Sequence, residues 1–327
     1  MNHQLFSQFI RLINSIPNIT VEQIQHKLDI DSNAALTLIV QLDQLGLSID
    51  SNNNKELRLT KNIQPLDIAL IKNELSENSL TQLDFLPPFL TLDSTNQHLK
   101  NTKIELSKLI RICLSEHQTS GRGRRSKFWV SPLAGNIYLS LHTRLKIPLK
   151  QIGGLSLVVG ISIIDGLKRL GIKGLAIKWP NDIYWKDKKL AGILIESTKM
   201  QENCVELIIG IGVNVDMPET DAKEIDQAWV DLKNITRSQM CRNKVIASII
   251  DQLISNINKY QQCGLDTFMS RWQELDYLFE KNVVVKSPDG KEKIGKAIGV
   301  NEQGELLLEL GNQIECIHAG DISVRKV

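Results

Sequence analysis

Residues 175–196 have the sequence LAIKWPNDIYWKDKKLAGILIE, which combines strand-forming runs with a rigid polar corner. Residues 175–178 and 193–196 are short apolar runs of the kind that form buried strands. Between them, Pro180 ends strand pairing and fixes φ, so we expect Asn181 and Asp182 to be held on a stiff corner and directed into a cleft. A β-turn made by Pro-Asn-Asp explains this corner equally well when it is considered alone.

Short β-branched runs, divided by glycines and by helical stretches, extend outward from this segment over the chain from residue 85 onward. Such a pattern predicts a mixed α+β domain, which we assign to residues 65–275. Residues 104–111 fit either a loop or a helix. Further strands are predicted at 111–114, 137–141 and 205–211, and helices at 154–170, 244–260 and 265–272.

The start of the chain predicts two helices. Leu5, Phe9 and Leu12 recur at helical spacing. Thr20 is a preferred N-cap residue, and Gln23 three positions later completes a capping box at the start of the second helix.

A third helix and a hairpin follow. Ser32 can cap a helix that runs to Leu45, and Gly46 supplies its stop. Residues 50–54, DSNNN, form a turn-rich tip between two short strands. Helix, turn, helix and wing in this order resemble a winged helix-turn-helix, which we assign to residues 1–64.

The end of the chain, residues 276–327, alternates strand signals with turn-forming residues. The turns fall at 287–290, 301–304 and 311–312. This spacing is typical of a small antiparallel barrel, so we predict a third domain made only of β-strands.

Bulk composition excludes several classes of protein. With 42% hydrophobic and 23% charged residues, the 327-residue chain is expected to fold as a globular protein. A net charge of +2 creates no global field for nucleic acid or an anionic membrane, so an anion site must be local. The five cysteines form no CxxC pair, which argues against a zinc site and fits a reducing cytoplasm. The start lacks a positively charged leader and apolar stretches such as 155–164 are short, so we expect a cytoplasmic protein without a membrane anchor.

The segment 121–125, GRGRR, suits an anionic ligand. Its glycines let the backbone approach a ligand closely, and its arginines supply planar, permanently charged donors. Gln118 precedes the segment and Trp129 follows it. A solvated basic loop or an RNA-binding tract is the alternative for this segment alone.

Two further segments add to this set. Lys189 precedes a strand start that contains glycine, where its ammonium would face a carboxylate or an α-phosphate and offset the charge of acyl-phosphate chemistry. Taken alone, Lys189 is better explained as a surface lysine. Residues 210–214, GIGVN, form a strand whose glycines admit a flat ligand beside the backbone. This segment lacks the rest of a dinucleotide fingerprint, so we reject a Rossmann fold.

Taken together and in order, these segments resemble the bacterial biotin protein ligases, which include the bifunctional biotin operon repressors. The resemblance extends along essentially the whole chain and rests on the combination of motifs. It implies a central ligase domain related to class II aminoacyl-tRNA synthetases and lipoate ligases, followed by an SH3-like barrel. The segments that carry it are 93–96 (DSTN), Gln118, 121–125, 178–182, 189–192 and 210–214.

The resemblance also implies roles for single residues. Arg124, Lys189 and Asp182 would be catalytic, with Asp182 orienting the attacking amine. Biotin and its adenylate would be bound by Ser94, Thr95, Asn96, Gln118, Gly121, Arg122, Gly123, Arg124 and Lys189. ATP and the adenylate would also contact Arg124, Arg125, Trp129, Lys178, Asn181, Asn214, Trp229 and Arg325. Arg124 and Arg125 would lie in a loop that orders over the intermediate, and Trp229 in a second loop that packs on the adenine.

The implied activity has two steps. The carboxylate of biotin attacks the α-phosphate of ATP, with Mg²⁺ neutralising the phosphates, and pyrophosphate leaves biotinyl-5′-AMP. A lysine of the biotin carboxyl carrier protein of acetyl-CoA carboxylase then attacks this anhydride and releases AMP. The enzyme would contribute mainly positioning and charge stabilisation, and the loops would exclude water. The resemblance further implies a homodimer of the adenylate-bound form, and no metal site of the protein's own is expected.

The charge of the N-terminal unit bears on DNA binding. Family repressors use the third helix to read operator DNA, and the candidate contacts here are Ser32, Asn33, Thr37, Gln41, Lys55 and Arg58. However, residues 1–64 carry five basic and six acidic residues, a net charge of −1, and residues 32–41 contain no Lys or Arg. Since DNA binding depends on phosphate neutralisation by such side chains, the charge argues against operator binding. The alternative is a structural unit that tunes ligase turnover or dimer packing.

Two other functions are compatible with the sequence. One is a biotin-sensing, DNA-binding repressor with little catalysis, and the other is a ligase for another cofactor acid, such as lipoate. Pyrophosphate release on addition of biotin, ATP and Mg²⁺ separates the ligase from the repressor, and replacing biotin with lipoate tests the other.

Overall fold

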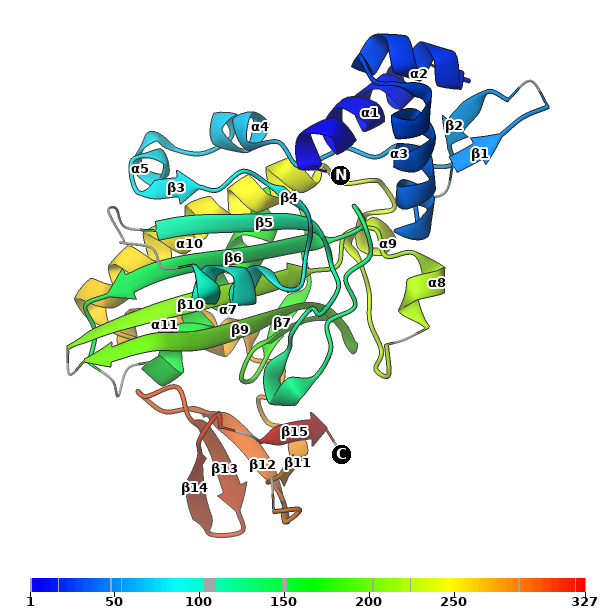
Figure 1. Cartoon of the computed structure of the whole chain (residues 1–327). Helices are drawn as coiled ribbons and strands as arrows, with labels where there is room; N and C mark the ends of the chain where they lie inside the picture. Colours follow the sequence, from blue (N-terminus) through cyan, green and yellow to red (C-terminus); the bar gives the residue numbers. More distant parts are fainter. Residues whose placement is uncertain are drawn as a thin grey trace.

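The computed structural model describes residues 2–16, 18–47, 49–53, 55–102, 110–148, 152–201, 203–223, 225–287, 289–320 and 322–326. Most of the segment predicted as loop or helix, residues 104–109, lies outside the described residues, as do Asn54 of the expected wing tip and Pro288 of the expected turn. Figure 1 shows a central sheet with a helical unit above it and a smaller sheet below it.

The central sheet is mixed, as the strand signals predict. Within the described residues it has eight strands, in the order β3-β5-β6-β10-β9-β8-β7, with β4 also paired to β5. The pairs from β5 to β7 are antiparallel, whereas β3 and β4 run parallel to β5. The strands are β3 (Leu83–Phe85), β4 (Phe89–Leu92), β5 (Ile110–Gln118), β6 (Ile137–Leu145), β7 (Leu175–Lys178), β8 (Asp182–Trp185), β9 (Lys188–Gln201) and β10 (Cys204–Val213).

All strands predicted for the central domain are present, although most are longer than expected. Strands β3, β4 and β8 were not predicted, because each is only three or four residues long. Lys189 lies inside β9 rather than before it. The corner at Pro180 joins β7 to β8, and the N–H of Asn181 donates to the carbonyl of Lys178 at 3.2 Å. The corner is therefore a hairpin turn, as the alternative interpretation proposed.

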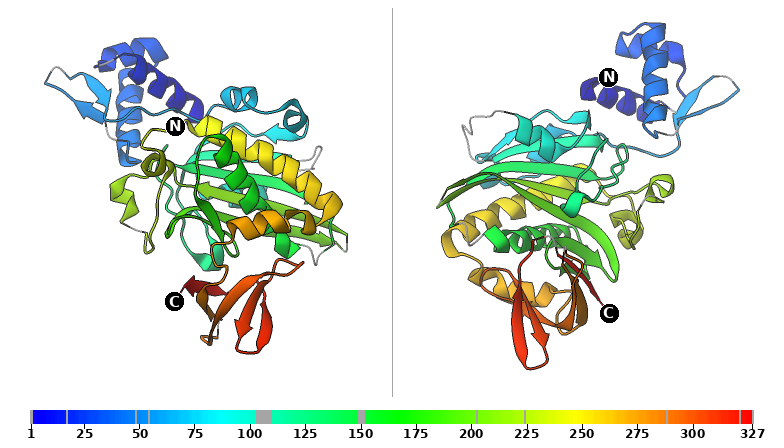
Figure 2. Two further views of the ribbon diagram at one scale, coloured as in Figure 1. Left: turned by 180° about the vertical axis from the view of Figure 1, so that it is seen from behind. Right: turned by 60° about the horizontal axis from the view of Figure 1, so that its bottom comes forward.

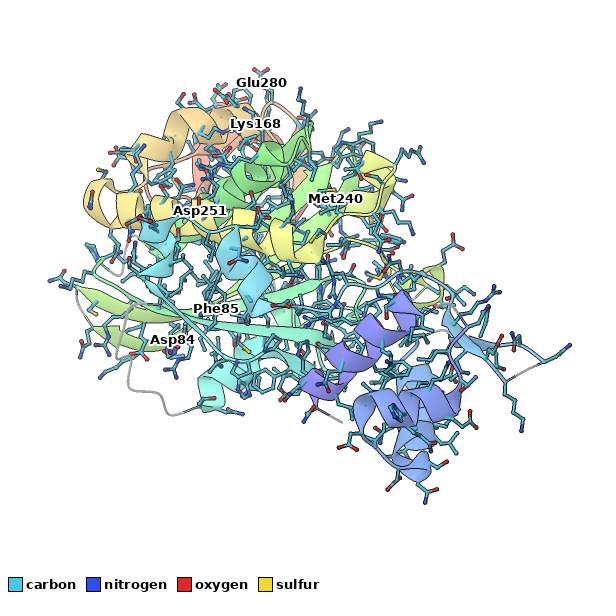
Figure 3. The ribbon with its side chains drawn as sticks, turned by 90° about the horizontal axis from the view of Figure 1, so that it is seen from above. Asp84, Phe85, Lys168, Met240, Asp251 and Glu280 are labelled. Carbon is cyan, nitrogen blue, oxygen red and sulfur yellow. The ribbon has the colours of Figure 1, made fainter. Side chains whose placement is uncertain are left out.

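Helices cover one face of the central sheet (Figure 2). The predicted helices at 154–170, 244–260 and 265–272 correspond to α7 (Ile152–Arg169), α10 (Arg242–Cys263) and α11 (Asp266–Leu275). Apolar side chains of these helices and of the sheet form the main core cluster, with Trp272 fully buried in it. The short helices α4 (Ile68–Asn73) and α5 (Glu77–Leu80) lie along α10, where the Ser79 hydroxyl donates to Asp251 at 2.6 Å (Figure 3).

The N-terminal unit contains α1 (His3–Ser15), α2 (Val21–Leu28), α3 (Ser32–Gln44) and a hairpin of β1 (Ile49–Ser51) and β2 (Leu57–Leu59). The predicted capping box of Thr20 and Gln23 is present. The N-cap of α3 is Asp31 and not Ser32, because the Asp31 carboxylate accepts from the Ala34 N–H at 2.8 Å. Among the described residues, the buried face of α1 consists of Phe6, Ser7, Phe9, Ile10 and Ile13, and the predicted Leu5 and Leu12 flank it.

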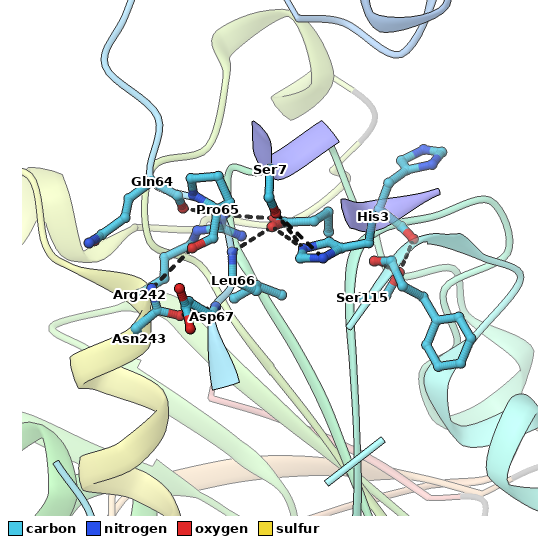
Figure 4. A network of polar contacts seen from close by, with 12 residues as sticks. His3, Ser7, Gln64, Pro65, Leu66, Asp67, Ser115, Arg242 and Asn243 are labelled. Carbon is cyan, nitrogen blue, oxygen red and sulfur yellow. Dashed lines mark hydrogen bonds and ion pairs between the residues drawn. The ribbon is translucent and has the colours of Figure 1, made fainter. Parts of the chain in front are cut away.

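The N-terminal unit shares its core and a buried charge network with the central domain. Its apolar cluster includes Leu90, Leu133 and Ala134 of that domain. Beside this cluster, the fully buried carboxylate of Glu116 on β5 pairs with Arg242 at 2.7 Å. It also accepts from the N–H of Leu66 at 2.6 Å and contacts His3 of α1 at 3.3 Å. The surrounding network, which joins α1, the connecting segment and the start of α10, is drawn in Figure 4.

The C-terminal sheet has the order β14-β13-β12-β11-β15 in the described residues. Its strands are β11 (Asn282–Lys286), β12 (Glu292–Val300), β13 (Leu306–Leu310), β14 (Gln313–Ile317) and β15 (Ser323–Lys326). Its buried apolar side chains, such as Val283, Leu306 and Leu308, belong to the main core cluster. The buried indole of Trp179, in the turn after β7, donates to the carbonyl of Gly304 at 2.9 Å. This sheet is therefore packed against the corner that the sequence predicted. No described helix is long and apolar enough to span a bilayer.

Candidate active site

The main cavity, of about 450 Å³, lies between the central sheet and β15. It brings together most of the residues that the sequence assigns to a site. These are Ser94, Thr95, Asn96, Gln118, Arg122, Gly123, Arg124, Arg125, Trp129, Lys178, Asn181, Asp182, Lys189 and Arg325. Asn214 and Trp229 line a neighbouring cavity of about 260 Å³, which shares Trp129 and Lys189 with the first. Gly121, the first residue of the glycine–arginine segment, lines neither cavity and lies against the Trp129 carbonyl and Ser131.

A chain of buried polar groups forms one end of the main cavity, where α6 (Thr95–Asn101) begins. The side-chain oxygen of Gln118 accepts from the N–H of Thr95 at 2.9 Å and from its hydroxyl at 3.2 Å. The hydroxyls of Thr95 and Ser140 are 2.7 Å apart, and Ser140 donates to Asn96 at 2.6 Å. Since these buried groups are hydrogen-bonded to one another, their orientations are fixed before a ligand arrives.

Glycines in β10 provide room for side chains of this protein. A Cβ at Gly210 would collide with the amide of Asn96, and one at Gly212 would lie 2.5 Å from the indole of Trp129. Both glycines also line the main cavity, so the expectation that they admit a flat ligand stays a prediction, with Asn96 and Trp129 beside them. Gly121 is required for a similar reason, since its Cβ would lie 2.6 Å from the Ser131 hydroxyl.

Positive charge gathers near the turn between β7 and β8. Lys178 is largely buried, and burial lowers the pKa of its ammonium. Asp182 opposes this shift, whereas repulsion from Lys189 and Arg325, with a smaller contribution from Lys127, lowers the pKa further. The carboxylate of Asp182 lies 2.8 Å from the Lys189 ammonium, which also stands over the Trp129 ring at 5.3 Å. Because several cations face one carboxylate, this part of the cavity favours a polyanion.

The loop of residues 121–125, which we call the arginine loop, is held by four different parts of the chain. Arg122 lies 3.3 Å from Glu196 on β9 and donates to Gln97 on α6 at 2.9 Å. Arg124 donates to Asn181 at 3.1 Å and to the carbonyls of Ala319 and Gly320 near β15. The loop therefore connects the central sheet with the C-terminal sheet across the cavity.

The segment around Trp229 joins the start of β9. The N–H of Lys189 donates to Ala228 at 2.9 Å, and the N–H of Val230 donates back to Lys189 at 2.9 Å. Asn214, at the end of β10, donates to the carbonyl of Val230 at 3.2 Å. These bonds hold Trp229 at the smaller cavity beside Trp129 and Lys189.

Sequence reasoning missed two residues at the Asn96 end of the cavity, Ser140 and Glu196. Residues 137–145 alternate apolar and polar side chains in their first half, and this alternation could have placed Ser140 on the face opposite the core. No local signal marks Glu196, which ends an apolar run and reaches Asn96 only through the folding of α6 onto the sheet.

The residues proposed for DNA contacts are all in the N-terminal unit. Ser32, Asn33, Thr37 and Gln41 are exposed on α3, and Lys55 and Arg58 are exposed at the hairpin. Arg58 is paired with Asp50 at 3.4 Å. In the described part of the chain, no group of three or more His, Cys, Asp or Glu side chains could hold a metal ion.

Comparison with known proteins places this chain in one class of enzyme. Residues 89–214 match the Biotin/lipoate A/B protein ligase family, and residues 278–325 match the biotin protein ligase C-terminal domain. The chain is therefore a ligase of the biotin and lipoate type, with a mixed α/β catalytic domain and a C-terminal β domain.

Longer matches give the particular family. The chain is 34% identical to the bifunctional ligase/repressor BirA of Salmonella typhimurium over 304 residues, which cover 93% of this chain and 92% of the relative. It is 35% identical to the Escherichia coli protein of the same name, over 90% and 89% of the two chains. A solved biotin protein ligase from Aquifex aeolicus, in complex with biotin and ATP, superposes with a TM-score of 0.63 at 27% identity, over 75% of this chain and 99% of that one. The chain belongs to the biotin protein ligase family.

Proposed function

We propose that this enzyme forms biotinyl-5′-AMP from biotin and MgATP and then transfers the biotinyl group to a lysine of a biotin carboxyl carrier protein. One observation carries the proposal. The main cavity joins a hydrogen-bonded polar end, built around Asn96 and Gln118, to a cationic end around Lys178, Lys189 and Arg325. An uncharged head group with a carboxylate tail fits the first end, and the phosphates of ATP fit the second.

In the first step, the biotin carboxylate attacks the α-phosphate, an anhydride bond forms, and pyrophosphate leaves. Lys189 stabilises the negative charge at the reacting phosphate, since a preorganised cation in a water-poor site lowers the barrier most where charge develops. Asp182, 2.8 Å away, holds this ammonium in position. Lys178 and Arg325 bind the remaining phosphates. Mg²⁺ enters with the nucleotide, as it usually does when phosphates supply several of its ligands.

In the second step, the neutral amine of the carrier lysine attacks the acyl carbon and AMP leaves. Asp182 orients this amine once Lys189 is drawn to the phosphate. The arginine loop, which spans the cavity through Arg124, protects the anhydride from water until the carrier arrives. The adenine lies by Trp129 and Trp229. Asn214 holds the segment that carries Trp229 through its hydrogen bond to the Val230 carbonyl. Further assignments to this site are Ser94, Thr95, Gly121, Arg122, Gly123, Arg125 and Asn181.

The test is pyrophosphate release by the whole protein with biotin and MgATP, followed by mass analysis of an added carrier domain. We expect release that depends on biotin and a single biotinylated lysine on the carrier. Release with lipoate but not with biotin would overturn the choice of substrate. Adenylate formation without carrier labelling would contradict the transfer step.

Binding of operator DNA is the second candidate function. The exposed Asn33, Thr37 and Gln41 on α3 favour it, as does the order of helices and hairpin, which we interpret as a winged helix-turn-helix. The net charge of −1 over residues 1–64 argues against it. Salt-dependent binding to the DNA upstream of the cell's own biotin genes would support this function, and no binding at low salt would exclude it.

We further propose that the units end near residues 64 and 275, which gives domains at 1–64, 65–275 and 276–327. The last of these is proposed to be an SH3-like barrel, and the central one to be related to class II synthetases. Formation of a homodimer in the adenylate-bound state is also proposed, with sedimentation in the presence and absence of biotin and MgATP as its test.

A further inference from the structure

Glu196 is placed behind the polar end of the cavity without lining it. Gly192 and Leu194 on β9 line the cavity, and Glu196 follows them on the same face of the strand. Its side chain is only 15% exposed. One carboxylate oxygen accepts from the Asn96 amide at 2.9 Å, and the other lies 3.3 Å from Arg122 and 3.7 Å from Lys100. A single carboxylate thus contacts two residues of α6, Asn96 and Lys100, and one residue of the arginine loop.

The contact with Asn96 is the shorter of two hydrogen bonds that orient its amide nitrogen, the other being to the Leu194 carbonyl at 3.4 Å. A carboxylate can only accept hydrogen bonds, so the Asn96 nitrogen faces Glu196 and the oxygen faces the Ser140 hydroxyl, 2.6 Å away. The Ser140 hydroxyl donates to the Asn96 oxygen and lies 2.7 Å from the Thr95 hydroxyl, which donates to Gln118. Without Glu196, the Asn96 nitrogen keeps only its longer hydrogen bond to the Leu194 carbonyl, at 3.4 Å, so the amide is held less firmly toward Ser140.

The contact with Arg122 acts on the loop. This ion pair is half exposed on the arginine side, at 44%, so it adds little to the stability of the whole protein. It instead restricts where the loop can lie, since Arg122 also donates to Gln97 on α6. The orientation of the Asn96 amide and the position of Arg122 are therefore both influenced at the same end of the cavity.

We propose that Glu196 is a positioning residue for biotin, which acts by fixing Asn96 and Arg122 and does not touch the substrate. The inference rests on the proposed function, because it takes this end of the cavity to hold biotin. It assigns to one carboxylate the coupling between α6 and the arginine loop.

Steady-state pyrophosphate release tests this with two variants and a matched control. Glu196→Ala removes all three contacts of this carboxylate and should raise the KM for biotin by about tenfold or more, with the KM for ATP unchanged. Glu196→Gln should have a smaller effect, because its amide oxygen still accepts from Asn96. The control is Glu206→Gln on β10, whose carboxylate is 16% exposed and lies 3.2 Å from Arg144, outside the main cavity. We expect its KM for biotin to equal that of the wild type.

Limited trypsin digestion of the ligand-free protein supplies a readout besides activity. Cleavage after Arg122 should be faster in both Glu196 variants than in the wild type and in Glu206→Gln. A double variant with Arg122→Ala should show less than the sum of the single effects on KM, since the two residues act together.

An active wild type together with an unchanged KM for biotin in Glu196→Ala would overturn this inference alone. Equal rises in both KM values, accompanied by equal effects of Glu206→Gln, would also overturn it, since they would indicate a general weakening of the sheet. A wild type without biotin-dependent pyrophosphate release would overturn the proposed function and this inference with it.

Discussion

The side chain of Lys189 is held in two ways before any ligand binds. Asp182 pairs with its ammonium at 2.8 Å, and the Trp129 ring lies beneath the ammonium at 5.3 Å. Lys189 also exchanges two backbone hydrogen bonds with the segment that carries Trp229. A flexible lysine is thereby limited to a narrow range of positions, which is what charge stabilisation at a reacting phosphate requires.

Replacing Lys189 with alanine should abolish most of the adenylation step. If Lys189 acts as one preorganised donor to the reacting phosphate, its loss should cost about 2.7 kcal/mol or more in the activation free energy, roughly a hundredfold in kcat. The measurement is pyrophosphate release at saturating biotin and ATP. Lys188→Ala, at the exposed neighbouring position on β9, serves as the control and should retain wild-type rates. Unchanged release by the Lys189 variant would refute its catalytic role.

Among the loops and turns, the arginine loop has contacts on both sides of the cavity, through Asn181 and through the carbonyls of Ala319 and Gly320. Arg124→Gly removes these contacts and leaves the cationic end of the cavity intact. Adenylation should therefore continue while biotinyl-5′-AMP escapes, which would be seen as indiscriminate biotinylation of lysines on an added bystander protein. Lys127→Gly, which alters a cation just after this loop without these contacts, is the control. A variant that labels bystanders no more than wild type would contradict closure by Arg124.

The joint between α11 and the C-terminal sheet contains a buried acid. Burial raises the pKa of the Asp276 carboxyl to about 6, although the N–H groups of Leu278 and Phe279 and the charge of Lys281 act in the opposite direction. Because the folded protein holds this proton more tightly than the unfolded chain, stability falls as pH rises from about 4 to about 6 and stays lower above that range.

Asp276→Asn should remove this pH dependence. Relative to wild type, the variant should gain on the order of 2–3 kcal/mol in unfolding free energy between pH 4 and pH 7, since one pKa unit corresponds to about 1.4 kcal/mol. Urea unfolding at both pH values measures the difference. The exposed Asp266→Asn, at the start of the same helix, should show no such gain. If the unfolding free energies of wild type and Asp276→Asn changed equally between the two pH values, this carboxyl would not titrate in that window.

Local signals predicted most of these elements, but not the contacts between them. The capping box at Thr20 and the corner at Pro180 were predictable because each depends on neighbours within a few residues. The cap of α3 was assigned to Ser32 because Asp31 and Ser32 are both good N-caps, and only the backbone geometry distinguishes them. The pairing of Arg124 with Asn181 could not be predicted, since it depends on the paths of two loops 57 residues apart. Similarly, only packing reveals that Asn96 and Trp129 occupy the space beside Gly210 and Gly212.

At the scale of the whole molecule, the N-terminal unit is attached to the ligase domain through buried groups. Glu116 on β5 is fully buried and meets α1, the segment before α4 and the first residue of α10. Burial alone would raise the pKa of its carboxyl, but Arg242, His3 and the Leu66 N–H outweigh burial and keep the pKa below its usual value. The carboxylate is thus charged in the folded protein and has its partners in place.

Breaking this attachment should destabilise the protein as a whole. Glu116→Gln leaves the Arg242 guanidinium, 5% exposed, without its countercharge, and removing one member of a buried pair typically costs about 3–5 kcal/mol. The control is Glu74→Gln. Glu74 pairs with Lys244, two residues after Arg242 on α10, and both side chains of this pair are exposed. Its loss should cost about 1 kcal/mol or less in unfolding free energy. Urea unfolding gives both values. Hydrogen exchange should also show faster opening of α1 in Glu116→Gln, because His3 loses its charged partner in the central domain. Equal losses in the two variants, with α1 unchanged, would mean that the N-terminal unit is held by its apolar contacts with Leu90 and Leu133 and not by the buried charge.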